Sequence, residues 1–169
     1  MLISVAQISR EDKGTAHYDL KEDFAQFSSE LEGVAFVAPV HVQLRVDNTG
    51  ESLLVRGTIT TELKVQCARC LESFPYPIQL DYEDEWVYAP KATEEQMETA
   101  LIFQKDDIDL TERIFEQIVL SLPMRFICSS ECKGLCPVCG VNRNVKSCSC
   151  NLDNIDPRFA ALANWPRED

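Results

Sequence analysis

Apolar and polar residues alternate along much of the first half of the chain, a pattern that predicts β-strands with one buried face. Between residues 34 and 46 every even position is apolar, and polar residues separate the later ones. Residues 53–65 are apolar at most odd positions, and residues 78–88 alternate again. Asp47 to Gly50 supplies a turn after the first of these strands. Three successive strands with short links predict an antiparallel meander.

A helical period replaces this alternation after residue 109. Leu110, Ile114, Ile118 and Leu122 recur at four-residue steps, with Asp109 as the expected N-cap and Pro123 as the stop. This helix is expected to pack on the apolar face of the sheet. Shorter elements are expected as a strand at residues 1–5 and as helices at residues 21–32 and 158–164. Residues 90–105 are expected to form a mobile loop with a helical turn around residues 94–100. The fold class predicted is α+β: an antiparallel meander or partly open barrel with a packed helix and a C-terminal zinc-knuckle module.

Composition and charge indicate whether the chain can form a core, where the protein is located and which kind of partner it favours. The 169 residues are 45% hydrophobic, enough for a real core, and the net charge is −12. The chain has no apolar run long enough to cross a membrane, and no secretory signal is visible, so a cytoplasmic protein without a membrane partner is expected. An acidic chain repels phosphate backbones at long range and favours a basic protein partner over non-specific nucleic-acid binding.

The eight cysteines all fall into close pairs, which points to metal rather than to disulfides in a cytoplasmic protein. The pairs are Cys67 and Cys70, Cys128 and Cys132, Cys136 and Cys139, and Cys148 and Cys150. Four pairs are the number that two tetrahedral Cys₄ zinc sites require. The stretch from Cys136 to Gly140 has the form of a zinc knuckle, with a glycine that can take a positive φ after the second thiol.

The spacing predicts which cysteines share a zinc ion. The knuckle and the pair that follows it after eight residues are expected to form one site, made of Cys136, Cys139, Cys148 and Cys150. The helix after residue 109 must fold back on the sheet, and it then brings the remaining pairs together as Cys67, Cys70, Cys128 and Cys132. Two alternatives stay open at this point: Cys67 and Cys70 are free thiols, or they join the knuckle in one mixed site.

The same residues argue against an enzyme. Catalytic zinc keeps an open position for water, whereas all-cysteine sites are closed and structural. The only histidines are His17 and His41, and no triad, phosphate loop or dinucleotide fingerprint is present, so we expect no catalytic residue, no cofactor other than zinc and no small-molecule substrate. Cys67 and Cys70 lie between strands rather than at a helix N-terminus, which disfavours redox catalysis. A zinc- or thiol-based redox-responsive regulator is kept as the alternative function.

Several motifs together resemble the YceD family, also described as large ribosomal RNA subunit accumulation proteins. They are Val65 to Glu72, Asp109 to Glu112, Leu122-Pro123, Cys132 to Gly140, and Asp156 to Arg158 with Leu162. The resemblance covers most of the chain from about residue 34. It implies a cytoplasmic ribosome biogenesis factor that supports 23S rRNA accumulation and assembly of the large (50S) subunit. It also implies that Cys67 and Cys70 pair with Cys128 and Cys132, apart from the knuckle site.

Two surfaces are candidates for contact with a large-subunit ribosomal protein or a pre-50S particle. An acidic stripe, defined as Asp81, Glu83 and Glu85, is expected on the outward face of the third long strand. An ordinary solvated sheet face explains this stripe equally well. Basic residues near the cysteines offer direct contact with rRNA; they are Arg69, Arg125, Lys133, Arg143, Lys146 and Arg158. The predicted domains are a sheet-and-helix core at 1–126 and a zinc-binding module at 127–169 docked on it.

Overall fold

The chain forms two compact units in the computed structural model, which describes residues 1–11, 13–104, 106–150 and 158. The first unit comprises residues 1–66 and 73–126. The second unit joins residues 67–72 to the chain from residue 127 onward. The turn between two strands of the first unit is therefore part of the second. The predicted boundary between 1–126 and 127–169, with docking of the two parts, stays a prediction.

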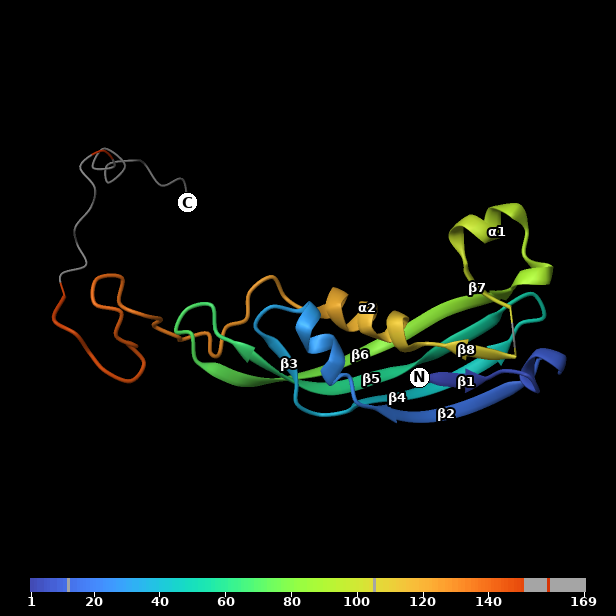
Figure 1. Ribbon diagram of the computed structural model, residues 1–169, viewed down its shortest axis with the longest axis horizontal. Coiled ribbons are helices and arrows are strands. Elements are labelled where there is room, and N and C mark those ends of the chain that lie inside the picture. Colours follow the sequence, from blue (N-terminus) through green and yellow to red (C-terminus); the bar gives the residue numbers. More distant parts are fainter. Residues whose placement is uncertain (12, 105, 151–157, 159–169) are drawn as a thin grey trace, which may run out of the picture. The chain divides into compact units, whose positions relative to one another are not determined.

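The first unit is rich in β-structure and has few helices (Figure 1). Its elements, in chain order, are β1 (Leu2–Ser4), η1 (Ile8–Arg10), β2 (Thr15–Glu22), η2 (Ala25–Glu30), β3 (Val34–Phe36), β4 (Val40–Asn48), β5 (Leu53–Gln66), β6 (Ser73–Tyr88), η3 (Ala89–Lys91), α1 (Glu94–Thr99), β7 (Leu101–Phe103), β8 (Asp107–Asp109) and α2 (Thr111–Ser121). The large sheet has the order β2-β4-β5-β6-β7, and β3 also pairs with β5. A second, two-stranded sheet joins β1 to β8. The α+β class is confirmed, and both sheets are open.

The meander predicted from alternation is confirmed as β4, β5 and β6, whose neighbours are antiparallel. The long hairpin of β5 and β6 pairs without interruption from Leu53 opposite Trp86 to Gln66 opposite Ser73. A Cβ atom at Gly57 would lie 1.9 Å from the carbonyl oxygen of Gln43, so only glycine permits the approach of β4 to β5 at this point. The strand β7 is parallel to β6, a pairing that the sequence pattern did not predict.

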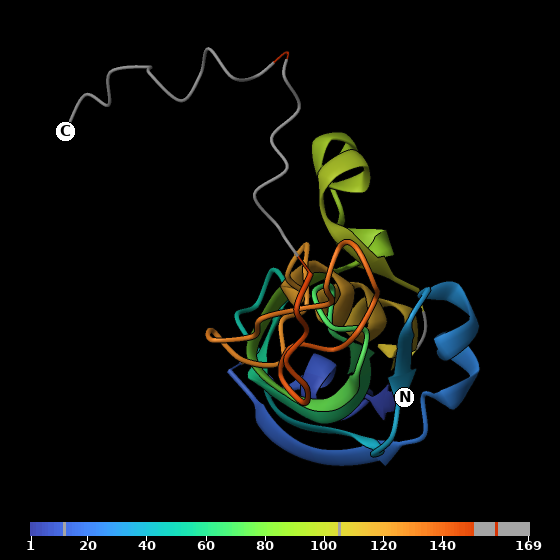
Figure 2. The ribbon, with the colours of Figure 1, turned by 90° about the vertical axis from the view of Figure 1, so that its left-hand side faces the viewer.

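The core lies between the large sheet and α2. Leu110, Ile114 and Ile118 are 0% exposed, and they belong to one cluster with the inward residues of β4, β5 and β6. Figure 2 shows the sheet curved, with α2 on its concave side. The prediction that this helix packs on the apolar face is confirmed. It ends before Pro123 as expected, but its N-cap is Leu110, and Asp109 accepts a bond from the N–H of Thr111 at 2.9 Å.

Two sequence predictions in the first third of the chain are wrong. The helix expected at residues 21–32 is instead the end of β2 followed by the 3₁₀ helix η2, because Phe24 and Phe27 turn into the core as an aromatic pair. The single strand expected at residues 34–46 is two strands, since Pro39 interrupts it. The expected strand at residues 1–5 and helical turn around residues 94–100 are present as β1 and α1. The expected helix at 158–164 lies outside the described residues, apart from Arg158.

The acidic residues of β6 do not all face the same way. Asp81, Glu83 and Glu85 are exposed, as predicted for the acidic stripe. Asp84 faces inward and forms a two-pronged ion pair with Arg113 of α2, with Nε to Oδ2 at 2.8 Å and Nη2 to Oδ1 at 2.9 Å. The side chain of Asp84 is only 8% exposed, so this pair fixes the helix to the sheet at a nearly dry position.

Removing the buried partner of this pair should destabilise the protein more than removing its exposed neighbour. We expect Asp84→Ala to lower the free energy of unfolding by about 2–3 kcal/mol, because Arg113 loses its nearly buried partner and keeps only the exposed Glu116. Glu83→Ala is the matched control, since the Glu83–Arg56 pair is more than half exposed on both sides; it should cost less than about 1 kcal/mol. Urea denaturation measures both, and equal losses would contradict the role assigned to Asp84.

Candidate metal centres

The structure gathers the eight cysteines into two sets of four, each within the second unit. Within each set the four sulfur atoms lie within 4.8 Å of one another. The first set is Cys67, Cys70, Cys128 and Cys132; the second is Cys136, Cys139, Cys148 and Cys150. These are the two groupings expected from the spacing and from the family resemblance. Ligation of a metal by these thiols stays a prediction.

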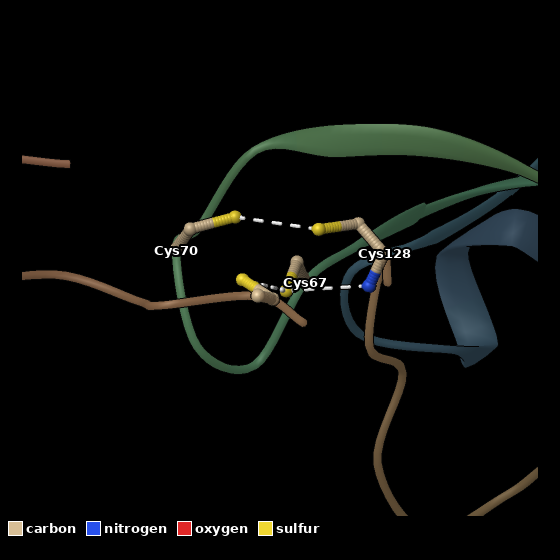
Figure 3. A group of neighbouring side chains, drawn as sticks. Cys67, Cys70 and Cys128 are labelled. Carbon is tan, nitrogen blue, oxygen red and sulfur yellow. Dashed lines mark hydrogen bonds between the residues drawn. The ribbon is translucent and has the colours of Figure 1, made fainter. Parts of the chain in front are cut away.

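The sulfur spacing in the first set fits a tetrahedral ion. Sγ of Cys67 lies 3.9 Å from Sγ of Cys132, and Sγ of Cys70 lies 3.7 Å from Sγ of Cys128. Figure 3 shows the thiols of Cys67, Cys70 and Cys128 pointing toward a common centre. Four sulfurs placed about 2.3 Å from one central ion are separated by about 3.8 Å at tetrahedral angles. The set therefore has the dimensions that a zinc ion requires.

Two turns of the same form present the first pair of each set. In the turn after β5, the N–H of Leu71 donates to the carbonyl of Cys67 at 2.9 Å, and the N–H of Cys67 donates to Glu72 at 2.9 Å. In the knuckle, Gly140 donates to Cys136 at 2.9 Å, and Cys136 donates to Val141 at 2.8 Å. The residue after the second cysteine has φ +61° in the first turn and φ +72° in the second.

The first turn thus has the same backbone form as the knuckle, with Leu71 where the second has Gly140. A leucine seldom adopts a left-handed φ, because its Cβ crowds the backbone. Sequence reasoning recognised only the knuckle by its glycine, and it treated Cys67 and Cys70 as a plain pair. The strained φ of Leu71 implies that the surrounding hydrogen bonds hold the first turn in place.

Backbone and side-chain donors surround the sulfurs of the first set. The N–H groups of Arg69 and Cys128 approach Sγ of Cys67 at 3.4 and 3.5 Å. The amide of Asn144 donates to Sγ of Cys132 at 3.3 Å. Such donors stabilise the thiolate form, which is the form that binds metal.

These contacts shift the pKa values of several of the thiols, and not all in the same direction. Burial alone would raise the pKa of Cys67, but bonds from three backbone N–H groups outweigh it and hold the pKa at about 6. The N–H groups of Cys139 and Val138 likewise lower the pKa of Cys136 to about 6. Desolvation and the neighbouring thiols raise the pKa of Cys128 to about 12. A divalent cation is the charge that would let all four thiols of a set ionise together.

The two sets differ in burial. In the first, Cys67, Cys70 and Cys132 are 0%, 4% and 6% exposed, and Cys128 alone is exposed. In the second, only Cys136 is buried; Cys139 is exposed, and Cys148 and Cys150 are half-buried. The first set is therefore the better shielded from solvent.

Two residues other than the cysteines, Arg69 and Asn144, hold the first set in place by hydrogen bonds. Nη1 of Arg69 donates to the carbonyls of Ser130 and Cys132 at 3.3 and 3.1 Å, so this arginine holds the loop that carries two cysteines of the first set. Besides its bond to Cys132, Asn144 accepts a bond from the N–H of Lys133 at 2.7 Å. Sequence reasoning counted Arg69 among the groups free to meet RNA and missed Asn144, which no motif singles out.

Neither histidine takes part in either set. His17 and His41 lie on β2 and β4 of the first unit, where Nε2 of His41 contacts Oδ1 of Asp19 at 2.7 Å.

No helix in the part of the chain that the structure describes is long and apolar enough to cross a membrane.

Comparisons with known proteins place this fold in a family. An uncharacterized protein of Mycobacterium tuberculosis H37Rv is 30% identical over 165 residues, which cover 96% of this chain and 79% of the relative. YlbN of Bacillus subtilis is 26% identical over 98% of this chain and 96% of its own length. A maize protein described as large ribosomal RNA subunit accumulation protein YCED homolog 1, chloroplastic, is 26% identical over 69% of this chain and 50% of its own length.

No solved structure matches the chain. The family model for the large ribosomal RNA subunit accumulation protein YceD matches residues 55–165, a range that holds all but the first two residues of the β5–β6 hairpin, together with α2 and both cysteine sets. The chain therefore belongs to the YceD family.

Proposed function

We propose that this protein is a non-enzymatic ribosome biogenesis factor of the cytoplasm, which supports accumulation of 23S rRNA and assembly of the large subunit. The observation that carries the proposal is the match of the YceD family model to residues 55–165. Relatives from maize and Arabidopsis thaliana that bear the family's description support it.

The chemistry of the cysteine sets supports a structural rather than a catalytic role. Each set offers four thiolates, which would fill the coordination of a zinc ion and leave no position for water or substrate. We assign one zinc ion to each set. The first ion would hold the turn after β5 to the loop that follows α2, and the second would close the knuckle on itself.

The distribution of charge supports a basic partner for the first unit. That unit holds 22 acidic and 10 basic residues, so the whole net charge of −12 resides there. In the acidic stripe, Glu83 is partly neutralised by Arg56 at 3.2 Å, which leaves Asp81 and Glu85 to meet a partner. A large-subunit ribosomal protein, alone or within a pre-50S particle, has the complementary charge.

Depletion of the protein in its own cells tests the proposed function. We expect the ratio of 23S to 16S rRNA to fall and particles lighter than 50S to accumulate on sucrose gradients. Wild-type protein should restore the ratio, whereas Cys67→Ser with Cys132→Ser should not, because the first set could no longer form. Glu98→Ala, at an exposed position of α1 outside the acidic stripe, serves as the control that keeps both sets. An unchanged rRNA ratio after full depletion would refute the proposal.

Native mass spectrometry should find two zinc ions per chain. Cys67→Ser with Cys132→Ser should remove one ion and expose the loop at residues 128–132 to hydrogen exchange, since structural zinc contributes directly to folding. Cys139→Ser with Cys150→Ser should remove the other ion and leave that loop protected. Rapid alkylation of Cys67 in the zinc-loaded protein would instead support the redox-responsive regulator.

The two ions should also leave at different rates. Because the second set is more open to solvent, a chelator is expected to remove one equivalent at least about tenfold faster than the other. A colorimetric zinc indicator follows the release, and the Cys139→Ser, Cys150→Ser variant should lack the fast phase. If the fast phase disappears instead in the Cys67→Ser, Cys132→Ser variant, the order of lability is reversed.

A further inference from the structure

We propose that the hairpin of residues 133–146, which lies between the two cysteine sets, binds the phosphate backbone of structured RNA. The inference rests on the proposed function and specifies the partner of the second unit. Three basic side chains of this hairpin would make the contacts: Lys133, Arg143 and Lys146, all of them exposed.

Hydrogen bonds hold these three residues close together. Leu135 bridges Asn142 in an antiparallel pair, and the N–H of Arg143 donates to the carbonyl of Gly134 at 2.9 Å. The N–H of Lys146 donates to Asn142 at 3.0 Å. Paired strands lie about 5 Å apart, so the three Cα atoms fall within roughly 12 Å of one another.

Both cysteine sets anchor the same hairpin. Cys132, of the first set, directly precedes Lys133, and Cys136 and Cys139 of the second set lie within the hairpin itself. Asn144 ties the hairpin to the first set through its bonds to Sγ of Cys132 and to the N–H of Lys133. Cations held on such a frame lose less conformational entropy on binding than cations on a free loop.

The basic residues of this hairpin have no carboxylate partner, unlike four arginines of the first unit. None of the three has a carboxylate within ion-pair distance among the described residues, and the stretch from 133 to 150 contains no Asp or Glu. In the first unit, by contrast, carboxylates pair with four arginines: Arg10, Arg45, Arg56 and Arg113. The hairpin thus keeps its cations available to an external anion.

The composition around the hairpin indicates which part of an RNA it would contact. Residues 67–72 and 127–150 contain no aromatic side chain, and Phe159 and Trp165 of the second unit lie outside the described residues. The hairpin itself therefore offers no platform for stacking on unpaired bases. A duplex presents one phosphate charge per ~1.7 Å of its axis, dense enough for three cations at this spacing. Recognition would therefore be of the backbone and largely independent of sequence.

The rest of the molecule limits the strength of this binding. The acidic first unit repels RNA at long range, and each zinc ion with four thiolates adds a charge of about −2. Binding then depends on direct contacts. A dissociation constant on the order of 10⁻⁵ to 10⁻⁴ M, in the weaker part of the range for non-specific binding, is expected near physiological salt.

Fluorescence anisotropy with the full-length, zinc-loaded protein tests the inference. The probe is a labelled RNA stem of about 20 base pairs and arbitrary sequence, titrated at several KCl concentrations. We expect the logarithm of the affinity to fall with the logarithm of salt with a slope of about −2.7, or about −0.9 for each of three phosphates. The triple variant Lys133→Gln, Arg143→Gln, Lys146→Gln should lose at least about tenfold in affinity and most of the slope.

A charge-matched variant separates the hairpin from the effect of net charge. Lys13→Gln, Lys21→Gln, Lys64→Gln removes the same three charges from exposed positions of the first unit, and it should bind the stem within about twofold of wild type. The charge-preserving variant Lys133→Arg, Arg143→Lys, Lys146→Arg should bind like wild type. Native mass spectrometry must show two zinc ions in every variant compared.

Three results would overturn the inference. In the first, the two triple glutamine variants weaken binding of the stem equally; in the second, the wild-type protein does not bind the stem. In the third, the hairpin variant loses binding of a basic ribosomal protein rather than binding of RNA. If depletion still lowers 23S rRNA while wild type binds no stem, the RNA contact fails and the proposed function stands. If depletion leaves 23S rRNA unchanged, the proposed function fails whatever the stem shows.

Discussion

The unbroken pairing of β5 with β6 is the interaction on which the other features depend. Its register sets which residues of both strands face α2, and hence the composition of the core. The same register leaves residues 67–72 as the connection between the strands, which is where the turn with Cys67 and Cys70 forms. A slip by one residue would turn Asp84 away from Arg113 and bring the acidic stripe into the apolar core. Core and metal site thus share one constraint.

Local patterns predicted the elements that a single buried face determines. The alternation around Val55, Ile59 and Leu63 and the four-residue period of α2 both survive folding, because each element has one apolar and one polar side. The strand β2 escaped prediction since its inward residues, Ala16, Tyr18 and Leu20, are only half-buried at the sheet edge. The parallel pairing of β6 with β7 requires the intervening residues to bring the chain back alongside β6, and no local sequence pattern predicts this.

The cysteine sets show a similar division. Spacing grouped Cys136, Cys139, Cys148 and Cys150, because short loops leave few ways to gather four thiols around one point. Grouping Cys67 with Cys132 needed the further expectation that the helix folds back on the sheet, and the family resemblance supported it. The similarity of the two turns became visible only from backbone hydrogen bonds and from the φ of Leu71. In the sequence, Gly140 indicates a turn with a positive φ, whereas a leucine at the same place does not. The bond from Asn144 to Sγ of Cys132 is visible only in the folded structure, because no sequence motif marks this asparagine.

The sequence separation within the first cysteine set has a consequence for biosynthesis. Sγ of Cys70 meets that of Cys128 across 58 residues, and Cys67 meets Cys132 across 65. At a translation rate of about 5–20 residues per second, the first two thiols wait roughly 3–13 s for the other two. During that interval the nascent chain carries two thiols that metals or oxidants can reach. The turn between β5 and β6 can therefore complete its set of four cysteines only after the loop at residues 128–132 has been synthesised.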